Sequence, residues 1–132
     1  MLVSPADIVA RAKATIKECT VTEVVERLNS EMLLIDIREL AEFKKGHIPG
    51  AILAPRGLLE FEIHGIVDRA LADPDIDREN CDIILYCGTG GRSALAAETL
   101  NTMGYHNVKS MAGGIVAWAT ARLPVETPFE ES

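Results

Sequence analysis

Residues 83–93 read Ile83-Ile84-Leu85-Tyr86-Cys87-Gly88-Thr89-Gly90-Gly91-Arg92-Ser93. A short run of apolar and aromatic side chains is followed at once by a cysteine and then by a glycine-rich turn. Such a run predicts a strand that is buried on both faces of a parallel sheet. In open α/β sheets ligands bind outside the carboxyl ends of the strands, so Cys87 is expected at the edge that holds a site.

The glycines of the turn, Gly88, Gly90 and Gly91, are expected to admit positive φ angles and to keep side chains out of the loop. Successive backbone N–H groups can then converge on one point as an anion-binding nest. A helix is expected to begin at about Arg92, and its positive dipole end favours negative charge at the same place. Because both effects favour thiolate over thiol, we expect Cys87 to be a nucleophile with a lowered pKa.

Three more side chains of this segment carry hydrogen-bond donors. Arg92 supplies a permanent positive charge with a fork of donors, and Thr89 and Ser93 supply hydroxyl groups. The alternative is structural, because a cysteine that ends a buried strand is often a small core residue and glycine clusters are often ordinary turns. The C-x4-R spacing, with glycine at three of the four intervening positions, favours an active site.

Helical and strand patterns alternate along the rest of the chain. Ser4 and Pro5 are typical of a helix start, and Ile8, Ala12 and Ile16 follow at helical spacing. The other expected elements are an edge strand at 19–21, a helix capped by Thr22 with Val24, Val25 and Leu28 buried, strands at 32–37, 51–54, 82–86 and 107–111, helices at 57–63, 92–103 and 114–122, and a polar surface excursion at 64–80.

Strands that alternate with helices imply an α/β domain with a mainly parallel sheet. The sequence shows no internal repeat and no linker that would divide it. We therefore expect one domain over residues 1–132, with 1–19 as an N-terminal helical extension and 125–132 as a polar tail.

The composition excludes several classes of protein. A chain of 132 residues buries roughly two-thirds of its unfolded surface and needs neither disulfides nor a metal to fold. The formal net charge is −7 and the basic residues are scattered, whereas a nucleic-acid-binding protein shows a basic stripe. No apolar run reaches the length of a bilayer span. We expect neither nucleic acid nor a membrane as a partner.

The three cysteines are Cys19, Cys81 and Cys87. Their spacing is not that of metal ligands, and their odd number argues against a closed disulfide framework. Reduced thiols indicate a reducing compartment, so the expected location is the cytoplasm. Cys19 and Cys81 are expected to be unreactive.

Several motifs together resemble one family. Cys87 to Ser93 resembles the active-site loop of rhodaneses, and the likeness extends from about Thr20 to Pro124. The other motifs that carry it are Leu34-Ile35-Asp36-Ile37-Arg38-Glu39 with Glu42-Phe43, Gly46-His47-Ile48-Pro49-Gly50-Ala51, Pro55-Arg56-Gly57-Leu58-Leu59-Glu60-Phe61, and Gly113-Gly114-Ile115 with Trp118.

The resemblance implies the rhodanese-like fold, a central mainly parallel sheet flanked by helices on both faces. It also implies a sulfurtransferase that takes sulfur from a small donor such as thiosulfate, holds it as a persulfide on Cys87, and passes it to a thiol or cyanide acceptor. No metal and no organic cofactor are expected. The implied site consists of the catalytic residues Cys87 and Arg92 and the substrate-binding residues Gly88, Thr89, Gly90, Gly91, Ser93 and Arg56.

One position departs from the family pattern. Many members place a basic residue directly after the cysteine, where this chain has Gly88. A persulfidic or protein-borne donor is therefore an alternative to thiosulfate. Arg56 is a candidate for the missing charge, and a solvated arginine at a helix start is the equal alternative.

Three other functions compete with the enzyme. The first is a sulfur-relay module that passes its persulfide to a partner protein, and the second is a non-catalytic rhodanese-like interaction domain. The third, phosphatase or arsenate reductase activity, is disfavoured because related enzymes use a C-x5-R loop, one residue longer, and because Tyr86 stands where phosphatases usually carry histidine.

Four more side chains have structural interpretations. Asp36 and Arg38 are expected to form a salt bridge or loop brace at the end of their strand. His47 is expected to be a hydrogen-bonding strut rather than a catalytic base, and Trp118 is expected to pack in the core.

Overall fold

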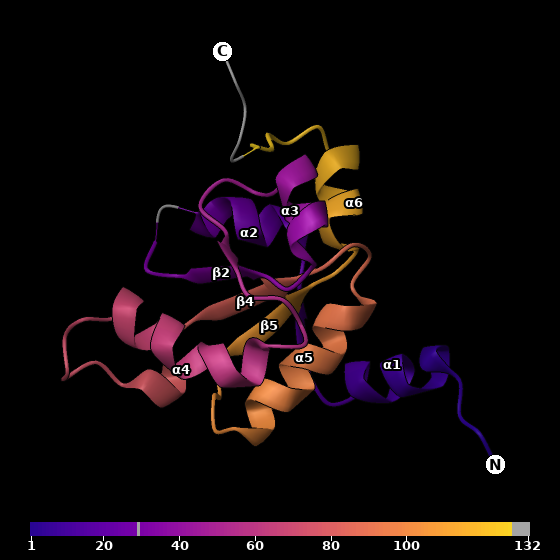
Figure 1. Cartoon of the computed structure of the whole chain (residues 1–132), viewed down its shortest axis with the longest axis horizontal. Coiled ribbons are helices and arrows are strands. Elements are labelled where there is room, and N and C mark those ends of the chain that lie inside the picture. Colours follow the sequence, from indigo (N-terminus) through magenta and orange to yellow (C-terminus); the bar gives the residue numbers. More distant parts are fainter. Residues whose placement is uncertain (29, 128–132) are drawn as a thin grey trace.

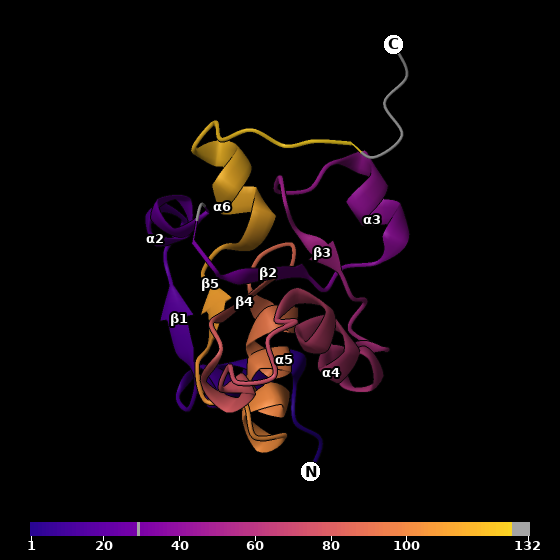
Figure 2. The ribbon, with the colours of Figure 1, turned by 90° about the vertical axis from the view of Figure 1, so that its left-hand side faces the viewer.

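One sheet of five parallel strands forms the centre of the protein, in the order β1-β5-β4-β2-β3. The computed structural model describes residues 1–28 and 30–127. The strands are β1 (Lys17–Cys19), β2 (Leu33–Asp36), β3 (Ile52–Leu53), β4 (Ile83–Tyr86) and β5 (Val108–Met111). The predicted α/β fold with a parallel sheet is confirmed, and β4 lies in its middle (Figure 2).

Helices cover both faces of the sheet (Figures 1 and 2). On one side lie α1 (Pro5–Lys13), α4 (Leu59–Ala70) and α5 (Gly91–Thr102). On the other side lie α2 (Val21–Arg27), α3 (Leu40–Lys45) and α6 (Gly114–Thr120). A short 3₁₀ helix, η1 (Arg78–Asn80), precedes β4.

The apolar strands build two cores because successive side chains point to opposite faces. Ile83 and Leu85 pack into the core under α4 and α5, whereas Ile84 and Tyr86 pack into the core under α2 and α6. All four side chains are fully buried. Trp118 is fully buried in the second of these cores, as its spacing predicts. Burial on both faces explains why the sequence of β4 is a continuous apolar run.

The edge strand predicted at 19–21 lies instead at Lys17–Cys19, so the N-terminal extension is helical only over Pro5–Lys13. Two predicted helix boundaries that affect the cores are also wrong. The second helix is capped by Thr20 and not by Thr22, because Glu23 completes a capping box: Glu23 N–H donates to Thr20 Oγ1 (3.1 Å) and Thr20 N–H donates to Glu23 Oε1 (3.3 Å). Val25, expected on the buried face of this helix, lies instead on its outer face and is 39% exposed.

The second wrong boundary concerns α4, which continues to Ala70 through the first part of the predicted surface excursion. Its buried residues include Ile63, Ile66 and Val67, so one apolar face continues along the sheet past the expected end at residue 63. His64 and Gly65, which separate Ile63 from Ile66, interrupt the apolar pattern and conceal this periodicity.

The chain segments at both ends of the described range contact the body of the protein. Helix α1 packs against α5, and β1 adds an edge strand next to β5. After α6, Trp118 Nε1 donates to Pro124 O (2.9 Å), and Glu126 forms an antiparallel bridge with His47. Over residues 1–28 and 30–127, no helix is both long and apolar enough to cross a membrane.

Candidate active site

Cys87 lies directly after β4, at the carboxyl edge of the sheet. Parallel β4–β2 and β4–β5 pairing places the ends of three strands at this edge. The loop turns within three residues, and α5 begins at Gly91, one residue before the predicted start, with Gly90 as its N-cap residue. The side chain of Cys87 is buried, with 1% of the residue exposed.

A set of donors surrounds the sulfur of Cys87. Gly90 N–H donates to Sγ at 3.1 Å and Ser93 N–H donates at 3.4 Å. Ser93 Oγ lies 3.4 Å from Sγ and 2.8 Å from Ser110 Oγ. Ser93 and Ser110 are fully buried. A hydrogen-bonded chain from Ser110 through Ser93 thus ends at the sulfur, an arrangement that stabilises negative charge there.

The pKa of Cys87 follows from two opposing effects. Burial alone would raise it, because a thiolate loses its hydration in the protein interior. Hydrogen bonds from the Ser93 hydroxyl and from the backbone N–H groups of Ser93, Gly90 and Thr89 outweigh burial and lower the pKa of Cys87 below its usual value. The lowered pKa of Cys87 agrees with the expectation from the glycine-rich loop.

The three loop glycines serve different purposes, and this corrects the expectation that all of them admit positive φ. Only Gly90 has a positive φ, of 104°. A Cβ at Gly88 would lie 3.3 Å from Nη2 of Arg92, so glycine leaves room for the guanidinium over the loop. A Cβ at Gly91 would make an ordinary contact with Val9 at 3.6 Å, and nothing in the structure requires glycine there.

The start of α6 packs directly on the back of the loop. Ile115 N–H donates to Cys87 O (2.9 Å) and Val116 N–H donates to Gly88 O (3.1 Å). A Cβ at Gly114 would lie 2.4 Å from Gly88 O and 2.5 Å from Cys87 O. Because both contacts involve backbone atoms, only glycine permits this close approach. The glycine pair of the C-terminal motif therefore fixes the shape of the cysteine loop.

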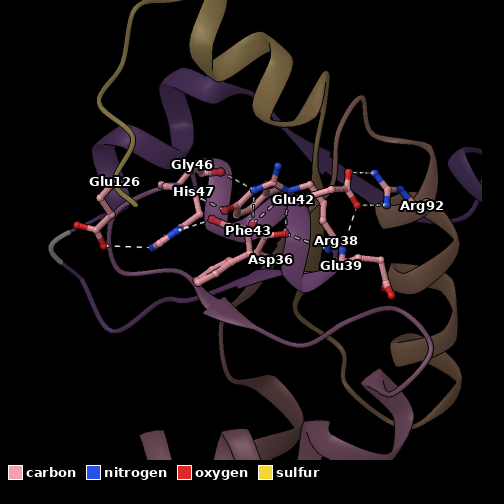
Figure 3. A network of polar contacts seen from close by, with 11 residues as sticks. Asp36, Arg38, Glu39, Glu42, Phe43, Gly46, His47, Arg92 and Glu126 are labelled. Atoms are coloured by element: carbon pink, nitrogen blue, oxygen red, sulfur yellow. Dashed lines mark hydrogen bonds and ion pairs between the residues drawn. The ribbon is translucent and has the colours of Figure 1, made fainter. Parts of the chain in front are cut away.

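Arg92 lies at the mouth of the loop, in a bidentate ion pair with Glu42 of α3 (Figure 3). Nη1 donates to Oε1 and Nη2 donates to Oε2, each at 3.0 Å. The Arg92 guanidinium lowers the pKa of Glu42 to about 2. Glu39 N–H also donates to Oε1 of Glu42 (3.1 Å), so the carboxylate is held from both sides.

Beneath this pair, Arg38 braces the end of β2 (Figure 3). Its Nη2 donates to Asp36 Oδ2 and to Gly46 O, both at 2.8 Å, and both members of the ion pair are buried. His47 Nδ1 lies 3.1 Å from Phe43 O, and its Nε2 lies 3.4 Å from Glu126 Oε1. The side chains of Asp36, Arg38 and His47 thus take the structural positions expected of them.

The structure brings Cys87, Gly88, Gly90, Ser93 and Arg92 together and leaves two predicted site residues at the periphery. Thr89 is exposed and contributes its backbone N–H toward the sulfur. Arg56 binds Glu60 Oε1 (2.8 Å) and Thr99 Oγ1 (3.2 Å). Thr99 lies about two turns of α5 beyond the loop, so Arg56 contacts the flank of α5 rather than the cysteine loop.

The other two cysteines lie in unfavourable surroundings for a thiolate. Both are buried and unpaired. Burial and the Glu23 carboxylate raise the pKa of Cys19 to about 11, and burial raises the pKa of Cys81. Both thiols are therefore protonated at neutral pH, as expected of unreactive cysteines.

Three residues of the site were not predicted as part of it: Ser110, Glu42 and Gly114. Ser110 shows a weak signal, because it is a small polar residue in an otherwise buried strand. Glu42 and Gly114 lie inside motifs that carry the family resemblance. Their contacts with the loop come from other elements and depend on the fold.

Comparison with known proteins establishes the family. The family model of the rhodanese-like domain matches residues 20–121, so the chain belongs to the rhodanese-like domain family. A sulfurtransferase from Allochromatium vinosum is 37% identical over 98 residues, which cover 74% of this chain and 81% of that protein. Thiosulfate sulfurtransferase GlpE from Haemophilus influenzae is 35% identical over 114 residues, which cover 86% of this chain and 97% of that protein.

A solved structure from Rhodopseudomonas palustris is similar over almost the full length of both proteins. It superimposes with a TM-score of 0.78 at 30% identity and covers 96% of each chain. That protein is described as one of unknown function and a possible tyrosine phosphatase. The family assignment thus agrees with the resemblance read from the sequence motifs.

Proposed function

We propose that the protein is a sulfurtransferase that moves a sulfane sulfur from a small donor to a thiol or cyanide acceptor through a persulfide on Cys87. The observation that carries the proposal is the set of donors at 3.1–3.4 Å from Sγ, provided by Gly90 and Ser93. These groups favour a thiolate in the resting enzyme and a negative terminal sulfur in the persulfide. The activity named for the Allochromatium and Haemophilus relatives supports the same reaction.

The proposed sulfur transfer needs neither a metal nor an organic cofactor. With thiosulfate, the Cys87 thiolate attacks the outer sulfur, and the S–S bond of the donor breaks. Sulfite leaves with the electron pair of that bond, and the outer sulfur stays on Cys87 as a persulfide. An acceptor thiolate or cyanide then attacks the terminal sulfur of the persulfide. The S–S bond of the persulfide breaks, and Cys87 leaves as a thiolate with the electron pair of that bond.

The loop residues have distinct proposed roles. Gly88, Thr89, Gly90, Gly91 and Ser93 would bind the transferred sulfur, and Arg92 would orient the donor at the mouth. A contribution from Arg56 would require that its side chain leave Glu60 and Thr99. Its role as a substrate-binding residue stays a prediction.

We place the reaction in the cytoplasm, where a reducing environment keeps thiols available. All three cysteines are unpaired, which supports this assignment. Small sulfur donors and acceptors are the expected partners, and a sulfur-relay protein is the expected alternative.

Intact mass spectrometry tests the proposal. Wild-type protein treated with thiosulfate, or with an alkyl persulfide, should gain about 32 Da, the mass of one sulfur atom, and should lose it on addition of cyanide. Peptide mapping should place the added sulfur on Cys87. Cys87→Ser should gain nothing, whereas Cys81→Ser, a matched change at a buried cysteine, should load normally. Loading of Cys87→Ser, or no loading of the wild-type protein by either donor, would contradict the proposal.

The kinetics of sulfur loading and release, together with a phosphatase assay, separate the competing functions. Fast loading but slow release to small acceptors would indicate a sulfur relay to a partner protein. Hydrolysis of a phosphotyrosine peptide by the wild-type protein and not by Cys87→Ser would indicate a phosphatase. We disfavour the phosphatase because the loop is one residue shorter than the C-x5-R loop that encloses a phosphate.

A further inference from the structure

The cation at the mouth of the site is already bound by a carboxylate. Arg92 and Glu42 form two parallel hydrogen bonds of 3.0 Å, the strongest geometry for this kind of pair. Their side chains are 44% and 39% exposed, so both can be reached by a molecule that approaches the loop. An incoming anion must therefore compete with Glu42 for the guanidinium.

Gly88 leaves room for this pair beside the nucleophile. A Cβ at residue 88 would lie 3.3 Å from Nη2 of Arg92, so the guanidinium lies over the loop at the residue that follows the nucleophile. The next arginine in this region, Arg38, is buried and bound to Asp36 and Gly46 O. Arg92 is therefore presented at the mouth as a neutralised pair rather than as a free cation, and the next cation, Lys45, lines the adjoining pocket.

A pocket with one apolar wall adjoins the pair. Its volume is about 330 Å³; Ile115, Val116, Ala119 and Val125 form an apolar wall, and Arg38, Glu42, Lys45 and Gly46 form a charged and polar wall. Val116 and Val125 are 55% and 48% exposed. The backbone N–H groups of Ile115 and Val116 bind the carbonyls of Cys87 and Gly88, so the apolar wall of the pocket lies beside the cysteine loop. The apolar wall suits a carbon chain, which thiosulfate does not have.

From these contacts we propose that Glu42 is a specificity-determining residue that disfavours dianionic thiosulfate and selects alkyl persulfides as sulfur donors. The inference rests on the proposed sulfurtransferase function. In the reaction, the Cys87 thiolate attacks the terminal sulfur of R–S–SH, and the S–S bond breaks. The alkyl thiolate leaves with the electron pair, and its carbon chain occupies the pocket beside Val116. The proton of the donor stays on the transferred sulfur and is then released to solvent.

Glu42→Gln tests the inference with two donors. The probes are thiosulfate and the persulfide of N-acetylcysteine methyl ester, whose tail carries no charge, and single-turnover loading of Cys87 is followed by intact mass. Because the substitution frees Arg92 to bind an anion, loading by thiosulfate should rise on the order of tenfold. Loading by the alkyl persulfide should stay within about twofold of the wild-type rate, because this donor makes no use of the freed cation.

Three further variants separate specificity from structure. Glu42→Asp keeps the negative charge and should keep the discrimination. Asp68→Asn releases Arg78 from an ion pair of 2.7 Å and changes the net charge equally, but it lies far from the loop and should alter neither rate. Val116→Ser, at an exposed position, should slow the alkyl persulfide about threefold to tenfold and leave thiosulfate unchanged.

Three results would overturn the inference, and one of them would also overturn the sulfurtransferase function. If Glu42→Gln leaves the thiosulfate rate unchanged, or moves both donors together, Glu42 does not set donor specificity and the inference is wrong. Wild-type protein that is loaded by neither donor would overturn the sulfurtransferase function itself, and the inference with it. Wild-type protein that prefers thiosulfate to the alkyl persulfide would overturn the inference alone.

Discussion

Ser93 is the side chain that most directly controls the charge state of Cys87. Its hydroxyl lies 3.4 Å from Sγ and is itself bound to Ser110 Oγ at 2.8 Å. Ser93→Ala removes a hydrogen bond that lowers the pKa of Cys87, so this pKa should rise and less thiolate should be present at neutral pH. The rate of alkylation by iodoacetamide at pH 7 should fall by roughly tenfold, and its pH profile should move to higher pH.

The control for this prediction is Ser30→Ala, which removes an exposed hydroxyl that donates to Arg27 O. Its alkylation profile should match that of the wild-type protein. Cys19 serves as an internal standard, because burial and Glu23 raise its pKa to about 11 and it should stay unmodified in every variant. A Ser93→Ala profile identical to the wild-type profile would show that the backbone N–H groups alone set the charge state.

At the level of elements, the junction between α6 and the cysteine loop controls the shape of the site. Gly114 has a φ of +57°, and a Cβ there would meet two backbone oxygens of the loop. Gly114→Ala should lower the free energy of unfolding by about 3 kcal/mol or more, from backbone strain and overpacking together, and should slow alkylation of Cys87. Urea denaturation and iodoacetamide kinetics measure the two effects.

Gly104→Ala is the matched comparison for Gly114→Ala. Gly104 has a φ of +106°, but nothing lies within 4 Å of the position of its Cβ. This variant should lose only about 1–2 kcal/mol, from the left-handed backbone, and should keep the reactivity of Cys87. Equal losses in the two variants would mean that the contact between Gly114 and the loop carries no extra energy.

The elements that the sequence predicts well are those whose signal is local. The strand at 83–86 is a continuous apolar run, and α5 begins within one residue of its predicted start because the glycine-rich loop marks it. The end of α4 lies beyond its predicted position because His64 and Gly65 separate its buried Ile63 from Ile66 and Val67. The cap at Thr20, two residues before the predicted cap at Thr22, depends on Glu23 at the third helical position, which completes the capping box.

The residues of the site also divide into those with a local signal in the sequence and those without one. The cysteine, its loop and Ser93 lie within one short segment, so their proximity is visible in the sequence. Glu42 and Ser110 reach the site from α3 and β5, and only the order of strands in the sheet brings them to the loop. The sequence therefore predicts the nucleophile, whereas the groups that tune it require the fold.

For the whole molecule, the net charge of −7 opposes the approach of any anion to Cys87. The Arg92–Glu42 pair adds no net charge at the mouth, so this long-range repulsion is not offset by the ion pair. Salt screens such repulsion, because the Debye length falls to about 8 Å at 0.15 M ionic strength. Reactions of Cys87 with anions should therefore accelerate as salt is added.

Two alkylating reagents of similar size measure this field without reference to sulfur transfer. Iodoacetate is an anion and iodoacetamide is neutral, so the ratio of their rates at Cys87 reports the potential at the sulfur. Between about 10 mM and about 300 mM salt the ratio should rise severalfold, because only the anion is repelled. A ratio that falls with salt would show that the local field of Arg92 and the loop N–H groups dominates over the net charge. Thiosulfate would then be attracted to the mouth despite Glu42, and its loading rate should fall with salt in parallel with iodoacetate.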